Sequence, residues 1–93
     1  MVMTWKQMTK YHISLRIERW DETSLTFDTI IIGRARLRDQ NRIITGSVDI
    51  EEENADDALS VARSDLKRAA YSMTLVTGIP YMWGEPEVKS WKQ

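Results

Sequence analysis

Residues 24–51 read SLTFDTIIIGRARLRDQNRIITGSVDIE, and this stretch decides the fold. Apolar and polar residues alternate through most of it, which is the pattern of β-strands with one buried face. A polar run at residues 39–42 interrupts the alternation, and its asparagine, Asn41, tolerates the positive φ that a short hairpin turn requires. The sequence therefore predicts a long β-hairpin, with one strand over residues 25–38 and a return strand over residues 43–51.

The register of this hairpin follows from the faces of its two strands. Centring the turn on the middle of the polar run pairs Leu37 with Ile44, and further along it pairs Ala35 with Gly46. The apolar residues of both strands then share one face, whereas a slip of one residue would bury the arginines of the other face. Gly33, Ala35 and Gly46 come together on the inner face. Because these residues have small side chains or none, either another element packs closely against them or the glycines mark a β-bulge.

A strand precedes the hairpin. Residues 11–19 alternate cleanly, with Tyr11 on the apolar face and His12 on the polar face. The connection over residues 20–24 is short, so we expect this strand to be the antiparallel neighbour of the first hairpin strand. Three strands in meander order result.

A helix follows the hairpin over residues 55–77. Asn54 is a suitable N-cap, Asp57 resembles the second half of a capping box, and Gly78 is the natural residue to end the helix. The apolar stripe of this helix is rich in alanine, so we expect it to lie close over the small residues of the hairpin. Its members, spaced three and four apart, are Ala55, Ala58, Leu59, Ala62, Leu66, Ala69, Ala70, Met73 and Val76.

These elements predict one α+β domain over residues 1–93. Its core is a three-stranded antiparallel meander sheet with one long C-terminal helix packed on one face, in the order βββα. Residues 1–10 form an N-terminal arm. Residues 79–93 form a C-terminal tail that packs partly on the core and supplies a short extra edge strand near residues 87–91.

Composition narrows the function classes. Thirteen basic and fourteen acidic residues give a net charge of −1, so any attraction to nucleic acid must come from a local patch. The absence of cysteine excludes disulfides and thiolate chemistry and fits a reducing compartment. No apolar run approaches the roughly 20 residues that span a bilayer, and the N-terminus does not resemble a signal peptide. We therefore expect a cytoplasmic chain that does not bind membranes.

Catalytic and metal-binding patterns are missing from the sequence. There is no nucleophile elbow, P-loop or glycine-rich dinucleotide fingerprint, and no pair of histidines at metal-ligand spacing. The single histidine, His12, lies on a polar strand face, where a solvated surface residue is the simplest interpretation. The acidic residues around Asp56 suit the start of a helix and its dipole. We therefore predict no enzyme activity, no cofactor and no metal.

Two features remain that suit binding. The first is a stripe of arginines on the outer sheet face near the hairpin tip. The second is an apolar patch: two isoleucines of the first hairpin strand are expected to point outward, and tryptophans lie in the flanking segments. A stripe of this kind also occurs as a solvated, edge-protecting face, and loop tryptophans also pack on their own domain. The predicted partner-binding residues are Ile30, Ile32, Arg34, Arg36, Arg38, Arg42, Trp20 and Trp83.

The leading functional hypothesis is a non-catalytic module that binds another protein through this outer face, with or without forming a homodimer. An adaptor or inhibitor is the expected type, and the small size resembles that of phage and mobile-element accessory proteins. The alternative hypothesis is a nucleic-acid-binding protein that uses the arginine stripe, although the stripe lacks the interleaved aromatic side chains that stack on bases. The order of elements carries no function by itself, because unrelated domains share it.

Overall fold

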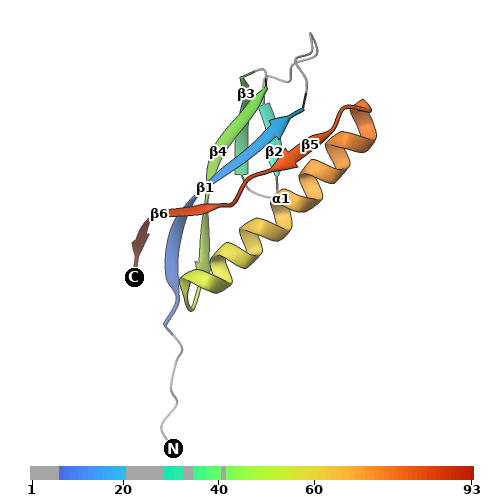
Figure 1. Ribbon diagram of the computed structural model, residues 1–93. Helices are drawn as coiled ribbons and strands as arrows, with labels where there is room; N and C mark the ends of the chain where they lie inside the picture. The colour runs from blue at the N-terminus through green and yellow to red at the C-terminus, as the bar shows by residue number, and fades with distance from the viewer. Residues whose placement is uncertain (1–6, 21–28, 33–34, 41) are drawn as a thin grey trace, which may run out of the picture.

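Two long strands, β1 (Thr9–Arg19) and β4 (Ile43–Glu52), form the centre of the sheet in the computed structural model (Figure 1). The structure describes residues 7–20, 29–32, 35–40 and 42–93, with residues 29–32 described by their backbone alone. The other elements are β2 (Thr29–Ile32), β3 (Ala35–Gln40), α1 (Ala55–Thr77), β5 (Tyr81–Trp83) and β6 (Glu87–Lys92). The strands pair in the order β2-β3-β4-β1-β5, and β6 also pairs with β1.

The predicted α+β class is confirmed. Every strand pairing is antiparallel, and α1 packs on one face of the sheet, where it contacts mainly β1, β5 and β4 (Figure 1). The short extra strand expected in the tail is also present, as β6 on the edge of β1. The number and order of the strands in the structure differ from those of the predicted three-stranded meander.

The prediction of one continuous strand over residues 25–38 is wrong within the described residues. β2 and β3 are separate strands that pair with each other, with Thr29 opposite Arg38 and Ile32 opposite Ala35. Antiparallel pairing of β2 with β3 requires the chain to reverse between Ile32 and Ala35. Gly33, predicted on the inner face, lies outside the described residues. A glycine in a two-residue connection is a hairpin signal, and the long run of β-formers around it hid that signal in the sequence.

The strand order also corrects the prediction. β1 lies beside β4, from the pair Thr9 and Glu52 to the pair Glu18 and Ile43, and not beside the first hairpin strand. β1 and β4 are the two longest strands, so pairing them satisfies the largest number of backbone groups in one ladder. β3 then takes the opposite side of β4, which makes β4 an interior strand near the hairpin turn.

The β3–β4 register differs from the prediction by two residues, which changes the partners but keeps the faces. Leu37 lies opposite Gly46, and Asp39 lies opposite Ile44. A Cβ atom on Gly46 would lie 3.0 Å from Leu37 Cγ and 2.6 Å from the backbone oxygen of Arg36. The missing side chain of Gly46 therefore lets the neighbouring strand β3 approach closely within the sheet.

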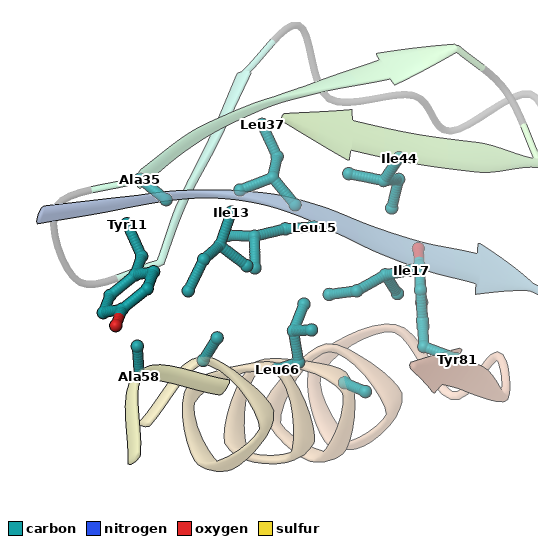
Figure 2. Packing of buried hydrophobic residues seen from close by; sticks show 12 residues of the cluster. Tyr11, Ile13, Leu15, Ile17, Ala35, Leu37, Ile44, Ala58, Leu66 and Tyr81 are labelled. Atoms are coloured by element: carbon teal, nitrogen blue, oxygen red, sulfur yellow. The ribbon is translucent and has the colours of Figure 1, made fainter. Parts of the chain in front are cut away.

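The core lies between α1 and the inner face of β1, β3 and β4 (Figure 2). On β1, the predicted alternation is confirmed, because Ile13, Leu15 and Ile17 are buried while the residues between them are more exposed. Burial of each such side chain contributes about 2 kcal/mol. The helix meets them with a narrow stripe of buried residues: Ala58, Ala62, Leu66 and Ala70.

Both predicted ends of α1 are confirmed. Asn54 Oδ1 accepts a hydrogen bond from the backbone N–H of Asp57 at 2.9 Å, and Gly78 ends the helix with a φ of 74°. Val76 is an exception within the predicted apolar stripe, because it is 82% exposed. Met73 is the last member of the predicted stripe that packs against the core. Within the described residues, no helix has the length and apolar character needed to cross a membrane.

A buried ion pair that the sequence did not predict joins β1 and β3 at the tip end, where β1 ends and β4 begins, and its arginine also contacts β5. Arg19 Nη2 on β1 lies 2.7 Å from Asp39 Oδ1 on β3, and both side chains are 0% exposed. The guanidinium of Arg19 also lies 5.9 Å from the ring centroid of Tyr81 on β5. The pair fixes the positions of the three strand ends that carry the surface described next.

Candidate interaction face

The sheet has one face covered by α1 and one face over which no described element lies (Figure 1). We call the second face the outer face. Its exposed side chains come from alternate positions of β1, β3 and β4: Lys10, His12, Arg16, Glu18, Arg36, Arg38, Thr45, Ser47, Asp49 and Glu51. The outer face is therefore mostly polar, and its charges divide between two ends.

At the end away from the tip, polar side chains pair across β1 and β4. His12 Nδ1 lies 2.7 Å from Asp49 Oδ1, and Lys10 Nζ lies 3.7 Å from Glu51 Oε1. Both pairs are about half exposed, so each stabilises the fold by at most about 1 kcal/mol. This arrangement accounts for His12 as a surface residue, as the sequence analysis expected.

At the tip end, basic side chains gather from two strands. Thr45 on β4 lies opposite Arg16 on β1 and opposite Arg38 on β3, so the two arginines flank it. Arg36 lies opposite the next outward residue of β4, Ser47. Arg16 Nε donates to Glu18 Oε1 at 2.9 Å. Arg36 and Arg38 form no ion pair with another described residue, which leaves their charges available to a ligand.

Exposed apolar side chains border these arginines. Trp20, at the end of β1, is 63% exposed, and its carbonyl oxygen accepts a hydrogen bond from Arg42 Nη2 at 3.1 Å. Ile43 and Met82 are also exposed, and they lie opposite Glu18 on its two neighbouring strands. Beside them, a shallow hollow of about 270 Å³ opens between Glu18, Arg42 and Ile43.

We call the combined surface the tip face. It consists of Arg16, Trp20, Arg36, Arg38, Arg42, Ile43 and Met82. Among the described residues, its four arginines lie beside one exposed carboxylate, that of Glu18, so the described part of this surface is positive although the whole chain carries −1.

Family models, curated proteins and solved structures show no significant match to this chain. No functional residue is therefore assigned by similarity, and the tip face is judged on its own chemistry. Four of the residues singled out in the sequence lie in it: Trp20, Arg36, Arg38 and Arg42.

The other predicted residues are not brought to the tip face. Trp83 lies opposite Ile17, a core residue, and its ring is 5.1 Å from Lys67 Nζ of α1, so it packs on the helix side. The backbone of Ile30 pairs with Leu37, and that of Ile32 pairs with Ala35. Paired residues share a face, so this register gives no support to an outward patch, and the two side chains lie outside the described part of the structure. Arg34 also lies outside the described residues.

Three members of the tip face were missed as site residues: Arg16, Ile43 and Met82. Arg16 occupies an outward position of the first predicted strand, so its direction was visible in the sequence. The sequence did not show that Arg16 lies near Arg38, because this nearness depends on the pairing of β1 with β4. Met82 joins the surface because β5 pairs with the end of β1, and residues 81–83 show no strand periodicity long enough to predict.

The described residues also bear on catalysis and metal binding. Within the described ranges, no three His, Asp or Glu side chains lie close enough together to hold a metal ion. The pKa of Glu87 is lowered by its hydrogen bond to Lys89 Nζ, 2.9 Å away, and by the charge of that lysine. This carboxylate is exposed on β6, away from any cluster, so its shift reflects a surface ion pair and not an acid–base site.

Proposed function

We propose that this chain is a non-catalytic protein-binding module of the adaptor or inhibitor type, and that its tip face binds an acidic, partly apolar surface of another protein. The observation that carries the proposal is the combination of unpaired Arg36 and Arg38 with exposed Trp20 in one surface. Arginine and tryptophan are the side chains most enriched among residues that dominate binding energy in protein interfaces.

The geometry supports this proposal because Arg16, Arg36 and Arg38 stand on strands. Their backbones are held by the β1–β4 and β3–β4 ladders, so binding does not have to order a loop. Rigid presentation lowers the entropy that association costs. Ile43 and Met82 supply apolar area beside the charges, and an interface with a desolvated apolar centre strengthens the ion pairs around it.

The charge distribution specifies the partner's chemistry. The tip face is positive, whereas the start of α1 carries Asp56 and Asp57. Attraction is therefore local, it favours acidic partner surfaces, and it weakens as salt is added.

A second candidate function is the binding of single-stranded nucleic acid. One observation favours it: the exposed ring of Trp20 lies beside Arg42, and an aromatic ring next to guanidinium groups suits a base and its phosphate. Against it, Trp20 is the one aromatic residue of the tip face, and proteins of this class use several stacking platforms.

The test compares wild-type protein with an Arg36→Glu, Arg38→Glu variant in affinity capture from cells of the source organism. The matched control, Arg68→Glu with Lys92→Glu, reverses two exposed charges away from the tip face. We expect the control to capture the same protein as wild type and the tip variant to lose it by at least about tenfold. Identical capture by the tip variant would show that the tip face is not the binding surface.

The second candidate is tested with labelled single-stranded DNA and RNA at low and high salt. Binding that weakens with salt and disappears in the tip variant would replace the protein-binding proposal with the nucleic-acid one. Light scattering over a range of concentrations tests the predicted homodimer. A single mass equal to one chain throughout would exclude it.

A further inference from the structure

One edge of the sheet is only half covered. β4 pairs with β1 along its whole length, but its other side pairs with β3 only as far as Ser47, opposite Arg36. From Val48 to Glu52, no described residue forms strand pairing on that side. Figure 1 shows β4 continuing past the end of β3 toward the start of α1. We call this segment the open edge.

The open edge borders a hollow of about 800 Å³ that reaches across to α1. On the helix side of the sheet, half-buried Val48 and Ile50 line it together with exposed Val61 of α1. On the other side, Asp49 and Glu51 line it. Successive residues of an extended strand point to opposite faces, so a strand laid along the open edge would meet an apolar surface and an acidic surface in alternation.

The hollow carries an excess of negative charge. Asp49, Glu51 and Asp65 line it, against Lys10 as its one lysine. Asp65 is half-buried on α1 and forms no ion pair with another described residue. Asp49 and Glu51 keep about half of their side-chain surface exposed despite their contacts with His12 and Lys10. Charge complementarity therefore favours a basic occupant.

We propose that the open edge binds an extended segment of another protein, in which apolar and basic residues alternate, by adding it to the sheet as a strand beside β4. Backbone hydrogen bonds to β4 would supply affinity, and the alternation of side chains would supply specificity, as in other cases of strand addition. The apolar side chains pack against Val48, Ile50 and Val61. The basic side chains face Asp49 and Glu51.

Charge also decides against a second copy of β4 as the occupant. An antiparallel pair of open edges would bring the acidic residues Asp49, Glu51 and Glu52 of one chain against those of the other. Like charges directly opposite each other destabilise a strand pair. This inference does not depend on the tip face, of which only Arg36, opposite Ser47, lies next to the open edge.

The test uses a labelled peptide in which lysine and valine alternate, and fluorescence anisotropy to measure its affinity for the full chain. The comparison peptides are a scrambled sequence of the same composition and an alternating glutamate–valine peptide. We expect the alternating lysine–valine peptide to bind at least about tenfold more tightly than either, because scrambling places half of its side chains on the wrong faces. NMR should show slower amide exchange confined to residues 48–52.

Variants locate the binding. Asp49→Lys with Glu51→Lys should weaken binding of the lysine–valine peptide by roughly tenfold, since it replaces two attractions by two repulsions. Glu87→Lys with Glu85→Lys makes the same charge change away from the open edge and should leave binding unchanged. Circular dichroism and thermal unfolding check that each variant folds.

Methylation of backbone nitrogens in the peptide removes hydrogen-bond donors without changing the charge of the peptide. It therefore tests strand addition separately from electrostatic attraction. The N–H groups of every second peptide residue point toward β4, and those of the residues between point away from it. Methylating the first set should abolish binding, and methylating the second set should leave the affinity unchanged. Equal affinity for the alternating and scrambled peptides, or equal effects of the two methylated sets, would overturn the proposal. So would a concentration-dependent oligomer that occupies residues 48–52 in the absence of peptide.

Discussion

Replacing Asp39 by alanine should destabilise the protein far more than an average surface substitution. The carboxylate of Asp39 lies 2.7 Å from Arg19 Nη2, and neither side chain is exposed. Removing it leaves the guanidinium charge in a site that water does not reach. Breaking a buried ion pair by removing one partner costs about 3–5 kcal/mol. A domain of this size has a total stability of about 5–15 kcal/mol, so the loss is a large fraction of it.

Urea denaturation, followed by circular dichroism and tryptophan fluorescence, measures this loss. The variant should reach its midpoint at a lower urea concentration with an unchanged m-value, because the surface exposed on unfolding stays nearly the same. The double substitution Arg19→Met with Asp39→Leu is the control. Replacing both charges by apolar groups removes the desolvation cost together with the attraction, so the double variant should be markedly more stable than Asp39→Ala.

Disruption of the exposed pair between Lys10 and Glu51 gives the reference for a surface interaction. Glu51→Ala should cost less than about 1 kcal/mol. If Asp39→Ala costs no more than Glu51→Ala, the Arg19–Asp39 pair is not buried in solution. The tip end would then lack the buried contact that holds its binding surface rigid.

Three further predictions concern local geometry. Gly46→Ala should destabilise the domain by about 1–3 kcal/mol in the same urea assay, because the new Cβ atom would lie 2.6 Å from a backbone oxygen of β3; a neutral result would contradict the β3–β4 register. Asn54→Ala should cost about 1 kcal/mol and lower the helical circular dichroism signal, since it removes the acceptor for the Asp57 N–H. Lys89→Ala should raise the pKa of Glu87 toward its ordinary value of 4.5 in an NMR titration, and an unchanged pKa would show that the pair does not form in solution.

The sequence predicts the faces of the strands better than it predicts their neighbours. Alternation assigned Ile13 and Leu37 to the core and Arg36 to solvent, because side-chain direction in a strand depends only on local backbone geometry. The helix ends were equally local, since Asn54 and Gly78 act on backbone groups within a few residues. Both kinds of prediction are confirmed for β1, β3, β4 and the ends of α1, whereas the register of β2 gives no support to the outward direction predicted for Ile30 and Ile32.

Pairing between strands depends on parts of the chain that are distant in sequence, and there the prediction failed. The reversal between β2 and β3 was hidden by the β-forming residues on both sides of Gly33. The Arg19–Asp39 pair was invisible for a related reason. Arg19 occupies an inward position on β1, but its partner is identified only when β3, β4 and β1 are known to lie side by side.

The shortness of the β2–β3 hairpin explains both proposed binding surfaces. β3 pairs with β4 only over residues 43–47, and over that length it places Arg36 and Arg38 on the outer face, with Arg38 and Arg16 on the two sides of Thr45. Because β3 begins at Ala35, it leaves the rest of β4 without a described partner on that side. One structural feature thus concentrates positive charge at the tip end and leaves an acidic strand edge at the other. The two surfaces differ in charge and in binding mode, so a variant that disables one should leave the other able to bind.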